Sequence, residues 1–272
     1  MLTIQIAHIN INIDFKFEEQ FHNIETYQTN EIGEYEIHSH FEEFSMPTGE
    51  PTRHTEFYDI YEIDDKTIQL QKSNDRIIGG IVYNKKRIDL YLIQKDFVTE
   101  YLLSQYALLY ILNQKQNAIF IHGASIVYHS KGILFSAKSG TGKSTHARLW
   151  RTYTDAVSLN DDKNIIVLED GQLMLYSNPW SGKHQIHQNI TAPLTCIVFL
   201  KQEKENQVSK VGVREAMRLL LGQIEPPKKN SVDVWNKMVD QILELPIYSY
   251  GCNMDPDAVT TLKTRLEMDL CL

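Results

Sequence analysis

Cysteine is scarce in this chain of 272 residues, and hydrophobic runs long enough to cross a bilayer are missing. The three cysteines, Cys196, Cys252 and Cys271, stand far apart and form no Cys-x-x-Cys pair. This spacing favours free thiols in a reducing compartment over a disulfide framework. The apolar stretch YALLYIL at 106–112 is far shorter than a bilayer span, and we expect it to be a helix core.

Excess basic charge is missing as well. The formal net charge is −8, and neither end carries a basic arm of the kind that binds nucleic acid. The N-terminal sequence MLTIQIAHININIDF lacks the basic start and continuous apolar core of a signal peptide. With 42% hydrophobic and 23% charged residues, the chain has the composition of a globular protein. We therefore expect a cytoplasmic protein that binds neither nucleic acid nor membrane.

The hydrophobic pattern divides the chain into a β-rich N-terminal domain, 1–115, and an α/β domain, 116–272. Alternation over 2–13 suits one half-buried strand, and hairpins are expected over 56–73 and 76–93, giving an antiparallel sheet or small sandwich. A helix with Asp96 as its N-cap is expected to connect the domains. The second domain alternates apolar strands with helices, so the fold class is mixed α/β.

The segment SAKSGTGKST at 136–145 has the composition of a phosphate-binding loop (P-loop, or Walker A motif). Glycines let successive backbone N–H groups turn toward an anion, and a following helix directs its N-terminus at the same anion. The second half of the pattern is intact, whereas Ala137 replaces the first glycine. Because an apolar strand precedes the segment and a helical pattern follows it, we favour a P-loop over an incidental turn.

Two acidic residues follow the next apolar strand, in the sequence SLNDDK. Asp161 and Asp162 come eighteen residues after Lys143, an interval that one helix and one returning strand can fill. Carboxylates suit Mg²⁺, which uses one or two protein oxygens together with phosphate. Adjacent residues in an extended segment point to opposite sides, so one aspartate can hold metal while the other faces an acceptor hydroxyl. An exposed Asp-Asp turn is the alternative.

Residues 121–145, IHGASIVYHSKGILFSAKSGTGKST, followed by LNDDK, resemble the catalytic domain of HPr kinase/phosphorylase. They are similar, more distantly, to the phosphate-loop region of ATP-dependent phosphoenolpyruvate carboxykinase. In that superfamily the loop precedes an Asp-Asp segment at about this distance, and bacterial HPr kinases carry an upstream His-Gly pair, matched by His122 and Gly123. The resemblance implies an HPr kinase/carboxykinase-like P-loop domain and covers residues 118–200.

The resemblance also implies a role for each matched residue. Lys143 would contact the β- and γ-phosphates of ATP, while Ser144 and Asp162 would hold Mg²⁺. Asp161 would be the base that takes the acceptor proton, and His122 would lie near the γ-phosphate or the acceptor. The order of the two aspartate roles stays open. The nucleotide would be bound by Ala137, Lys138, Ser139, Gly140, Thr141, Gly142, Lys143, Ser144 and Thr145.

The sequence departs from the family downstream of the aspartates. The HPr-kinase signature RGLGIIN is missing, and SNPWSGKHQIHQN at 177–189 stands in roughly its place, so HPr is not the expected substrate. No match to the oxaloacetate-binding arginines of carboxykinase is found, and decarboxylation is not expected. Within this segment Lys183 is a catalytic candidate because it could neutralise charge on the transferring phosphoryl group. A surface loop is the alternative.

The function expected from these residues is that of an ATP-dependent kinase acting on a hydroxyl group. The acceptor would be a peptide or protein serine or a small hydroxylated metabolite, and the N-terminal domain would choose the substrate or mediate homo-oligomerisation. A nucleotide-binding sensor or recruitment module without transfer chemistry is the alternative. The aspartate pair favours the enzyme, because a pure binder needs at most one metal ligand. ATP, GTP and pyrophosphate are not distinguished, since no base-reading motif is visible.

Overall fold

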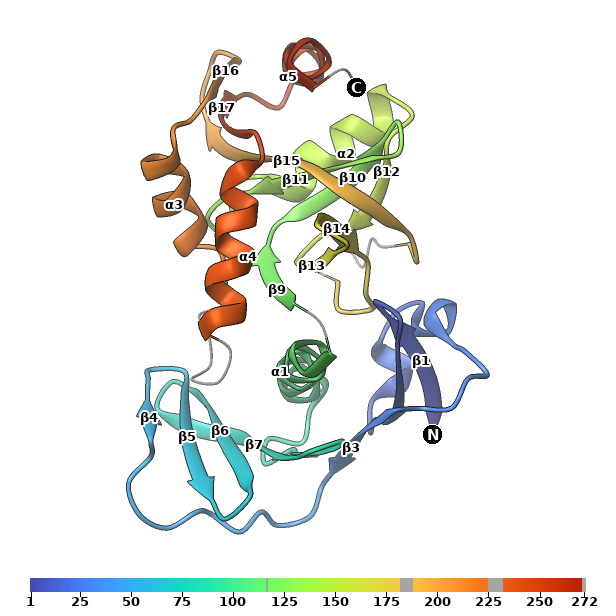
Figure 1. The fold of residues 1–272 in the computed structure, drawn as a ribbon, viewed down its shortest axis with the longest axis vertical. Coiled ribbons are helices and arrows are strands. Elements are labelled where there is room, and N and C mark those ends of the chain that lie inside the picture. Colours follow the sequence, from blue (N-terminus) through green and yellow to red (C-terminus); the bar gives the residue numbers. More distant parts are fainter. Residues whose placement is uncertain (116, 182–187, 225–231, 271–272) are drawn as a thin grey trace. The chain divides into compact units, whose positions relative to one another are not determined.

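The protein, analysed as a computed structural model, forms two compact units, 1–115 and 116–272 (Figure 1). The structure describes residues 1–115, 117–181, 188–224 and 232–270. Each unit has its own sheet and its own helices, so the chain is a mixed α/β protein, and the predicted fold class is confirmed. Among the described helices, none is long and apolar enough to span a bilayer.

The N-terminal unit is built on an eight-stranded sheet in the order β1-β2-β3-β8-β7-β6-β5-β4. The pairs β2–β3 and β3–β8 are parallel, so the sheet is mixed rather than purely antiparallel as predicted. Both hairpins expected from the sequence, β5–β6 and β7–β8, are confirmed. The strands are β1 (Leu2–Ile6), β2 (Ile9–Asp14), β3 (Tyr35–His40), β4 (Arg53–His54), β5 (Tyr58–Ile63), β6 (Lys66–Ser73), β7 (Arg76–Asn84) and β8 (Arg87–Tyr91).

The alternating segment 2–13 forms a hairpin, so the prediction of one strand is wrong. Its turn residues Ala7 and His8 both have positive φ, 47° and 63°, a conformation that the sequence did not signal because neither is Gly, Asn or Asp. The alternation itself is preserved, since Ile9, Ile11 and Ile13 on β2 are all buried. Two 3₁₀ turns, η1 (Glu18–Gln20) and η2 (Ile24–Tyr27), follow this hairpin.

Helix α1 (Phe97–Lys115) packs on the sheet of the N-terminal unit, against β3, β7 and β8 (Figure 1). The predicted cap is confirmed, because the Asp96 carboxylate accepts a hydrogen bond from the Thr99 N–H at 2.8 Å. One turn on, the fully buried Glu100 accepts hydrogen bonds from the backbone N–H groups of Lys16 and Phe17 at 2.7 and 2.8 Å. These bonds satisfy a carboxylate that burial alone would disfavour.

The C-terminal unit is built on nine strands in the path β12-β10-β11-β15-β14-β13-β9, with β17 beside β15 and β16 beside β17. Strands β11, β15 and β17 run parallel, so their carboxyl ends meet at one edge, where ligands of open α/β sheets bind. The strands are β9 (Asn117–His122), β10 (Ala124–Tyr128), β11 (Lys131–Ser136), β12 (Val157–Asn160), β13 (Lys163–Glu169), β14 (Gln172–Tyr176), β15 (Thr191–Gln202), β16 (Gln207–Lys210) and β17 (Ile247–Cys252).

Helices cover both faces of the central strands of this unit. Helices α2 (Lys143–Tyr153) and α5 (Pro256–Leu270) contact each other and enclose one apolar core. Helices α3 (Val213–Leu221) and α4 (Val232–Glu244) pack over a second core on the other face, together with strands β9, β13 and β14 (Figure 1). The segment 137–142 therefore connects β11, at the centre of the sheet, to α2 in one of the two helical layers.

Helix α2 carries a histidine on its buried face. His146 is 3% exposed, and its Nε2 accepts a hydrogen bond from the Trp150 indole N–H at 3.2 Å. The rings of Phe135 and Tyr250 meet its ring edge to face, at centroid distances of 4.9 and 5.6 Å. Burial disfavours the imidazolium ion and lowers the pKa of His146 from 6.5 to about 4.

This histidine predicts that the protein loses stability as the pH falls from about 6.5 to 4. In that window the unfolded chain takes up a proton at His146 and the folded protein does not, which favours unfolding. Above about pH 6.5 His146 is neutral in both states, and the protein keeps its full stability. The full shift corresponds to about 3 kcal/mol of unfolding free energy. Urea unfolding at pH 7.5 and 5, compared with the variant His146→Phe, measures it. An equal pH dependence in the two proteins would contradict the prediction.

Candidate phosphate-binding site

The loop 137–142 joins β11 to α2 and contains both glycines of the motif. Gly140 and Gly142 have φ of +79° and +106°, in the left-handed region that other residues rarely adopt. A Cβ at Gly142 would also lie 2.8 Å from the Cε of Met254, but the end of that flexible side chain can shift, so the backbone conformation is what requires glycine there. The residues that follow, from Lys143 onward, form the first turn of α2, whose free N–H groups favour an anion.

Lys143 is held inside the loop by the loop's own carbonyl groups. Its Nζ donates hydrogen bonds to the carbonyl oxygens of Ala137, at 2.9 Å, and Lys138, at 3.4 Å. On the outside, the Gln202 amide at the end of β15 donates to the carbonyls of Gly140 and Thr141, at 3.4 and 3.3 Å. The loop is therefore held on the inside by hydrogen bonds from Lys143 and on the outside by hydrogen bonds from Gln202 of the neighbouring parallel strand β15.

The two aspartates lie on a bend between β12 and β13. The Asn160 side chain accepts a hydrogen bond from the Asp162 N–H at 2.9 Å, which makes the bend, so the expectation of an extended segment is wrong. Asp161 is buried, with 8% of its surface exposed, whereas the Asp162 side chain is 25% exposed. The two carboxylates thus occupy different environments.

His122, at the end of β9, is paired with Asp162. Its Nδ1 lies 2.9 Å from Asp162 Oδ1, and the Gly123 N–H donates to the Asp162 carbonyl at the same distance. Ser136, the last residue of β11, donates its hydroxyl to the His122 carbonyl at 2.7 Å. A Cβ at Gly123 would lie 2.6 Å from the carbonyl oxygen of Phe135, so glycine permits the close approach of the β9–β10 connection to β11.

The charges of Asp162 and Lys143 act on each other across the loop. Burial opposes ionisation of Asp162, but the hydrogen bond from His122 and the positive charges of His122, Lys163 and Lys143 outweigh it, so the pKa of Asp162 is lowered. Burial lowers the pKa of Lys143, and the Asp162 charge partly restores it. Asp162 is therefore ionised near neutral pH, and a carboxylate beside the loop suits a metal–phosphate complex.

A buried network of amide and hydroxyl groups fixes the aspartate bend. The Asn160 amide donates to the carbonyls of Asn178 and Trp180, at 3.2 and 3.3 Å, and the Asn178 amide donates to the Lys163 carbonyl at 2.8 Å. The Ser125 hydroxyl donates to the Asn164 side chain, whose amide reaches the Gly123 carbonyl at 2.8 Å. Sequence reasoning missed these positioning residues, although polar residues within apolar strands were the available signal.

The remaining predicted residues fall on either side of Lys143. Lys138, Ser139 and Gly140 are exposed, whereas Ala137 is buried against the core. Ser144 and Thr145 stand partly buried in the first turn of α2, and Thr141 is partly buried in the loop. Lys183 lies outside the residues that the structure describes. Trp180, in the same sequence segment, is 1% exposed and packs in the interior rather than presenting a stacking surface.

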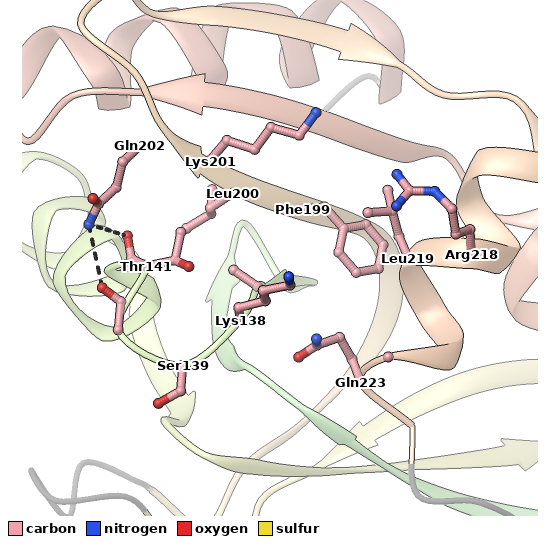
Figure 2. A pocket seen from close by; sticks show the side chains of 13 residues that line it. Lys138, Ser139, Thr141, Phe199, Leu200, Lys201, Gln202, Arg218, Leu219 and Gln223 are labelled. Carbon is pink, nitrogen blue, oxygen red and sulfur yellow. Dashed lines mark hydrogen bonds between the residues drawn. The ribbon is translucent and has the colours of Figure 1, made fainter.

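A cleft of about 630 Å³ opens beside the loop (Figure 2). Residues 137–141 of the loop line one side, and Phe199 and Gln202 of β15 line another. Figure 2 shows Gln202 bonded to the loop at one end of the cleft, with Arg218 of α3 and Gln223 at the other. The Gln223 carbonyl accepts a hydrogen bond from the His122 N–H at 2.9 Å, which connects this end to the His122–Asp162 pair.

The donor set beside the loop fits a hard cation such as Mg²⁺. Asp162 supplies an ionised carboxylate and Ser144 a hydroxyl, the oxygen ligands that Mg²⁺ takes together with water and phosphate. Among the described residues, no three His, Cys, Asp or Glu side chains are grouped as a metal site. The residues therefore fit a cation shared with a phosphate ligand.

Comparison with known proteins identifies no family for the chain. No protein-family model matches it, and no curated protein matches it in sequence. Among solved structures, it has a likeness to the Hpr(Ser) kinase/phosphatase from Coxiella burnetii. The alignment covers 55% of this chain and 98% of that one, at 13% sequence identity and a TM-score of 0.34. At these values the likeness does not assign a function to the chain.

Proposed function

We propose that the protein is an ATP-dependent kinase that transfers the γ-phosphoryl group to a hydroxyl. The observation that carries the proposal is the loop between β11 and α2, where Gly140 and Gly142 have positive φ and the Nζ of Lys143 is held by the loop's own carbonyl groups. A phosphate-binding loop supplies one half of such a site, and an anionic group that neighbours its lysine supplies the other. The pairing of His122 with Asp162 holds the second half in place.

In the proposed reaction the hydroxyl oxygen of the acceptor attacks the γ-phosphorus and forms a new P–O bond. The bond between the γ-phosphorus and its bridging oxygen breaks, and ADP leaves with that electron pair. Asp161 takes the proton from the hydroxyl, in the role of a general base. Lys143 and the N–H groups of the loop stabilise the charge that develops on the phosphoryl oxygens.

Asp162 and Ser144 would hold Mg²⁺, which neutralises phosphate charge when it is bound. His122 then acts as a positioning residue, because its hydrogen bond keeps the Asp162 carboxylate oriented and ionised. The buried Asn160 and Asn178 hold the same bend from the other side. These assignments give each polar group around the loop a separate task.

The proposal is tested by comparing nucleotide binding with turnover in the purified protein. We expect Mg²⁺-dependent binding of ATP and formation of ADP that increases when a hydroxyl acceptor is added. Isothermal titration calorimetry measures binding, and a coupled assay measures ADP. Binding without ADP formation, with any serine peptide or polyol tried, would instead support a nucleotide-binding module. The absence of binding would contradict the proposal outright.

A further inference from the structure

We propose that the cleft beside the loop binds the acceptor, and that this acceptor is a small hydroxyl compound carrying a carboxylate or phosphate group. The inference rests on the proposed kinase function and adds the class of substrate. The cleft of about 630 Å³ lies within the size range of small-molecule sites.

The lining of the cleft is positively charged. Among the described residues that line it, Lys138, Lys201 and Arg218 carry positive charge and none carries negative charge. Glu215 lies 3.9 Å from the Arg218 guanidinium, at the edge of ion-pair distance, and the Arg218 side chain is 71% exposed, so its other donors are accessible to a ligand. A basic cleft is unexpected on a chain with a net charge of −8, and it favours an anion over the rest of the surface.

Amide groups accompany the charges. Gln202 and Gln223 line opposite ends of the cleft, and Phe199 and Leu219 supply apolar surface between them (Figure 2). An apolar surface with a few convergent polar groups is the usual composition of a small-molecule site. Carboxylate and phosphate groups match the guanidinium of Arg218, which can donate two parallel hydrogen bonds to either.

The α3 end of the cleft suits the acceptor better than the nucleotide. The phosphates of a bound nucleotide would face the loop and the N-terminus of α2 at one end of the cleft, whereas the other end is lined by α3, which packs on the opposite face of the sheet. Its Gln223 end adjoins His122, the partner of Asp162. An anion held by Arg218 would therefore place an attached hydroxyl between the cleft and the reacting γ-phosphoryl group.

Binding of two matched anions tests the inference. D-glycerate and glycerol 3-phosphate carry hydroxyls beside a carboxylate or a phosphate, and glycerol is their uncharged counterpart. We expect both anions, but not glycerol, to bind with dissociation constants on the order of millimolar in NMR titrations. Each titration is made first without nucleotide and then with Mg²⁺ and a non-hydrolysable ATP analogue bound, so that the second titration has the nucleotide site filled.

Three variants locate the binding. Arg218→Gln and Lys201→Gln are each expected to weaken binding of both anions about tenfold, because each removes a charged donor from the cleft. Arg214→Gln is the matched control, since Arg214 is exposed one turn earlier on α3 and does not line the cleft. We expect it to bind the anions as the wild-type protein does.

Each other outcome overturns a stated part of the argument. Binding of neither anion, or equal binding by all three variants, overturns the inference. Anion binding that the ATP analogue abolishes would mean that the cleft belongs to the nucleotide, and binding of an acidic serine peptide alone would replace the small molecule by a peptide. Failure of the ATP analogue itself to bind would overturn the proposed kinase function, a result that is separate from the anion titrations.

Discussion

Replacing Lys143 by methionine is expected to lower the rate of phosphoryl transfer about a thousandfold at saturating ATP. Methionine keeps the unbranched chain as far as its fourth atom but lacks the ammonium group that would stabilise charge on the transferring phosphoryl oxygens. The hydrogen bonds of Lys143, to the carbonyls of Ala137 and Lys138, hold the ammonium inside the loop before any ligand arrives. Because that position is fixed in advance, little reorganisation is needed when phosphate binds, which makes the group effective in the transition state.

The control for this variant is another lysine that bonds a backbone carbonyl. Lys131 begins the same strand β11, and its Nζ donates to the Leu270 carbonyl at 3.2 Å, at a distance from the loop along the chain. Lys131→Met is expected to keep full activity, and thermal unfolding of both variants checks that each is folded. ADP formation at saturating Mg²⁺ and ATP is the measurement. Activity of a folded Lys143→Met protein within tenfold of wild type would contradict the proposed role.

The two aspartates are expected to fail in different ways when each is replaced by asparagine. Asp161→Asn removes the proposed base and should lower turnover by about 10²–10⁴, with nucleotide affinity and Mg²⁺ requirement unchanged. Asp162→Asn removes the ionised ligand, so the Mg²⁺ concentration for half-maximal rate should rise roughly tenfold or more. The distinction follows from their environments. The negative charge of Asp162 interacts with the positive charge of Lys143, whereas Asp161 is the more deeply buried of the two aspartates.

Titration of the rate with Mg²⁺ separates the two roles. Asp155→Asn is the matched control. Asp155 precedes β12, the strand that the two aspartates follow, and its side chain is 71% exposed. The opposite pattern would reverse the assignment. In that case Asp161→Asn would need more Mg²⁺ for half-maximal rate, and Asp162→Asn would have a low turnover even at saturating Mg²⁺. Wild-type behaviour of both variants would remove the aspartates from the mechanism and with them the proposed transfer chemistry.

Local elements of this fold could be predicted from the sequence because they depend on neighbouring residues. The Glu-Asp-Gly sequence at 169–171 favours the tight turn between β13 and β14, and Asp170 and Gly171 have the positive φ values that such a turn requires. Helix α1 was expected from its period and from its cap. The turn at Ala7 and His8 was missed because neither residue is Gly, Asn or Asp, the usual residues of a two-residue hairpin turn.

The arrangement of the site depends on contacts between distant residues, which a single sequence does not display. The motif placed Lys143 and the aspartates in one region, but it did not predict that His122 would pair with Asp162. That pair forms because β9 and β13 are hydrogen-bonded neighbours, forty residues apart in the chain. The basic cleft is likewise assembled from the loop, β15 and α3, which are separate in sequence and carry no shared motif.

Strand β15 belongs to both halves of the candidate site. Its first residues, from Thr191, pair with β14 of the hairpin that follows the aspartates. Its later residues pair with β11 and β17, and its last residue, Gln202, holds the loop. Separating the β13–β14 hairpin from β11 requires breaking backbone bonds of this one strand. Amide hydrogens of β11, β14 and β15 should therefore exchange with solvent as a single cooperative unit, so that the loop and the aspartate hairpin persist together or are lost together.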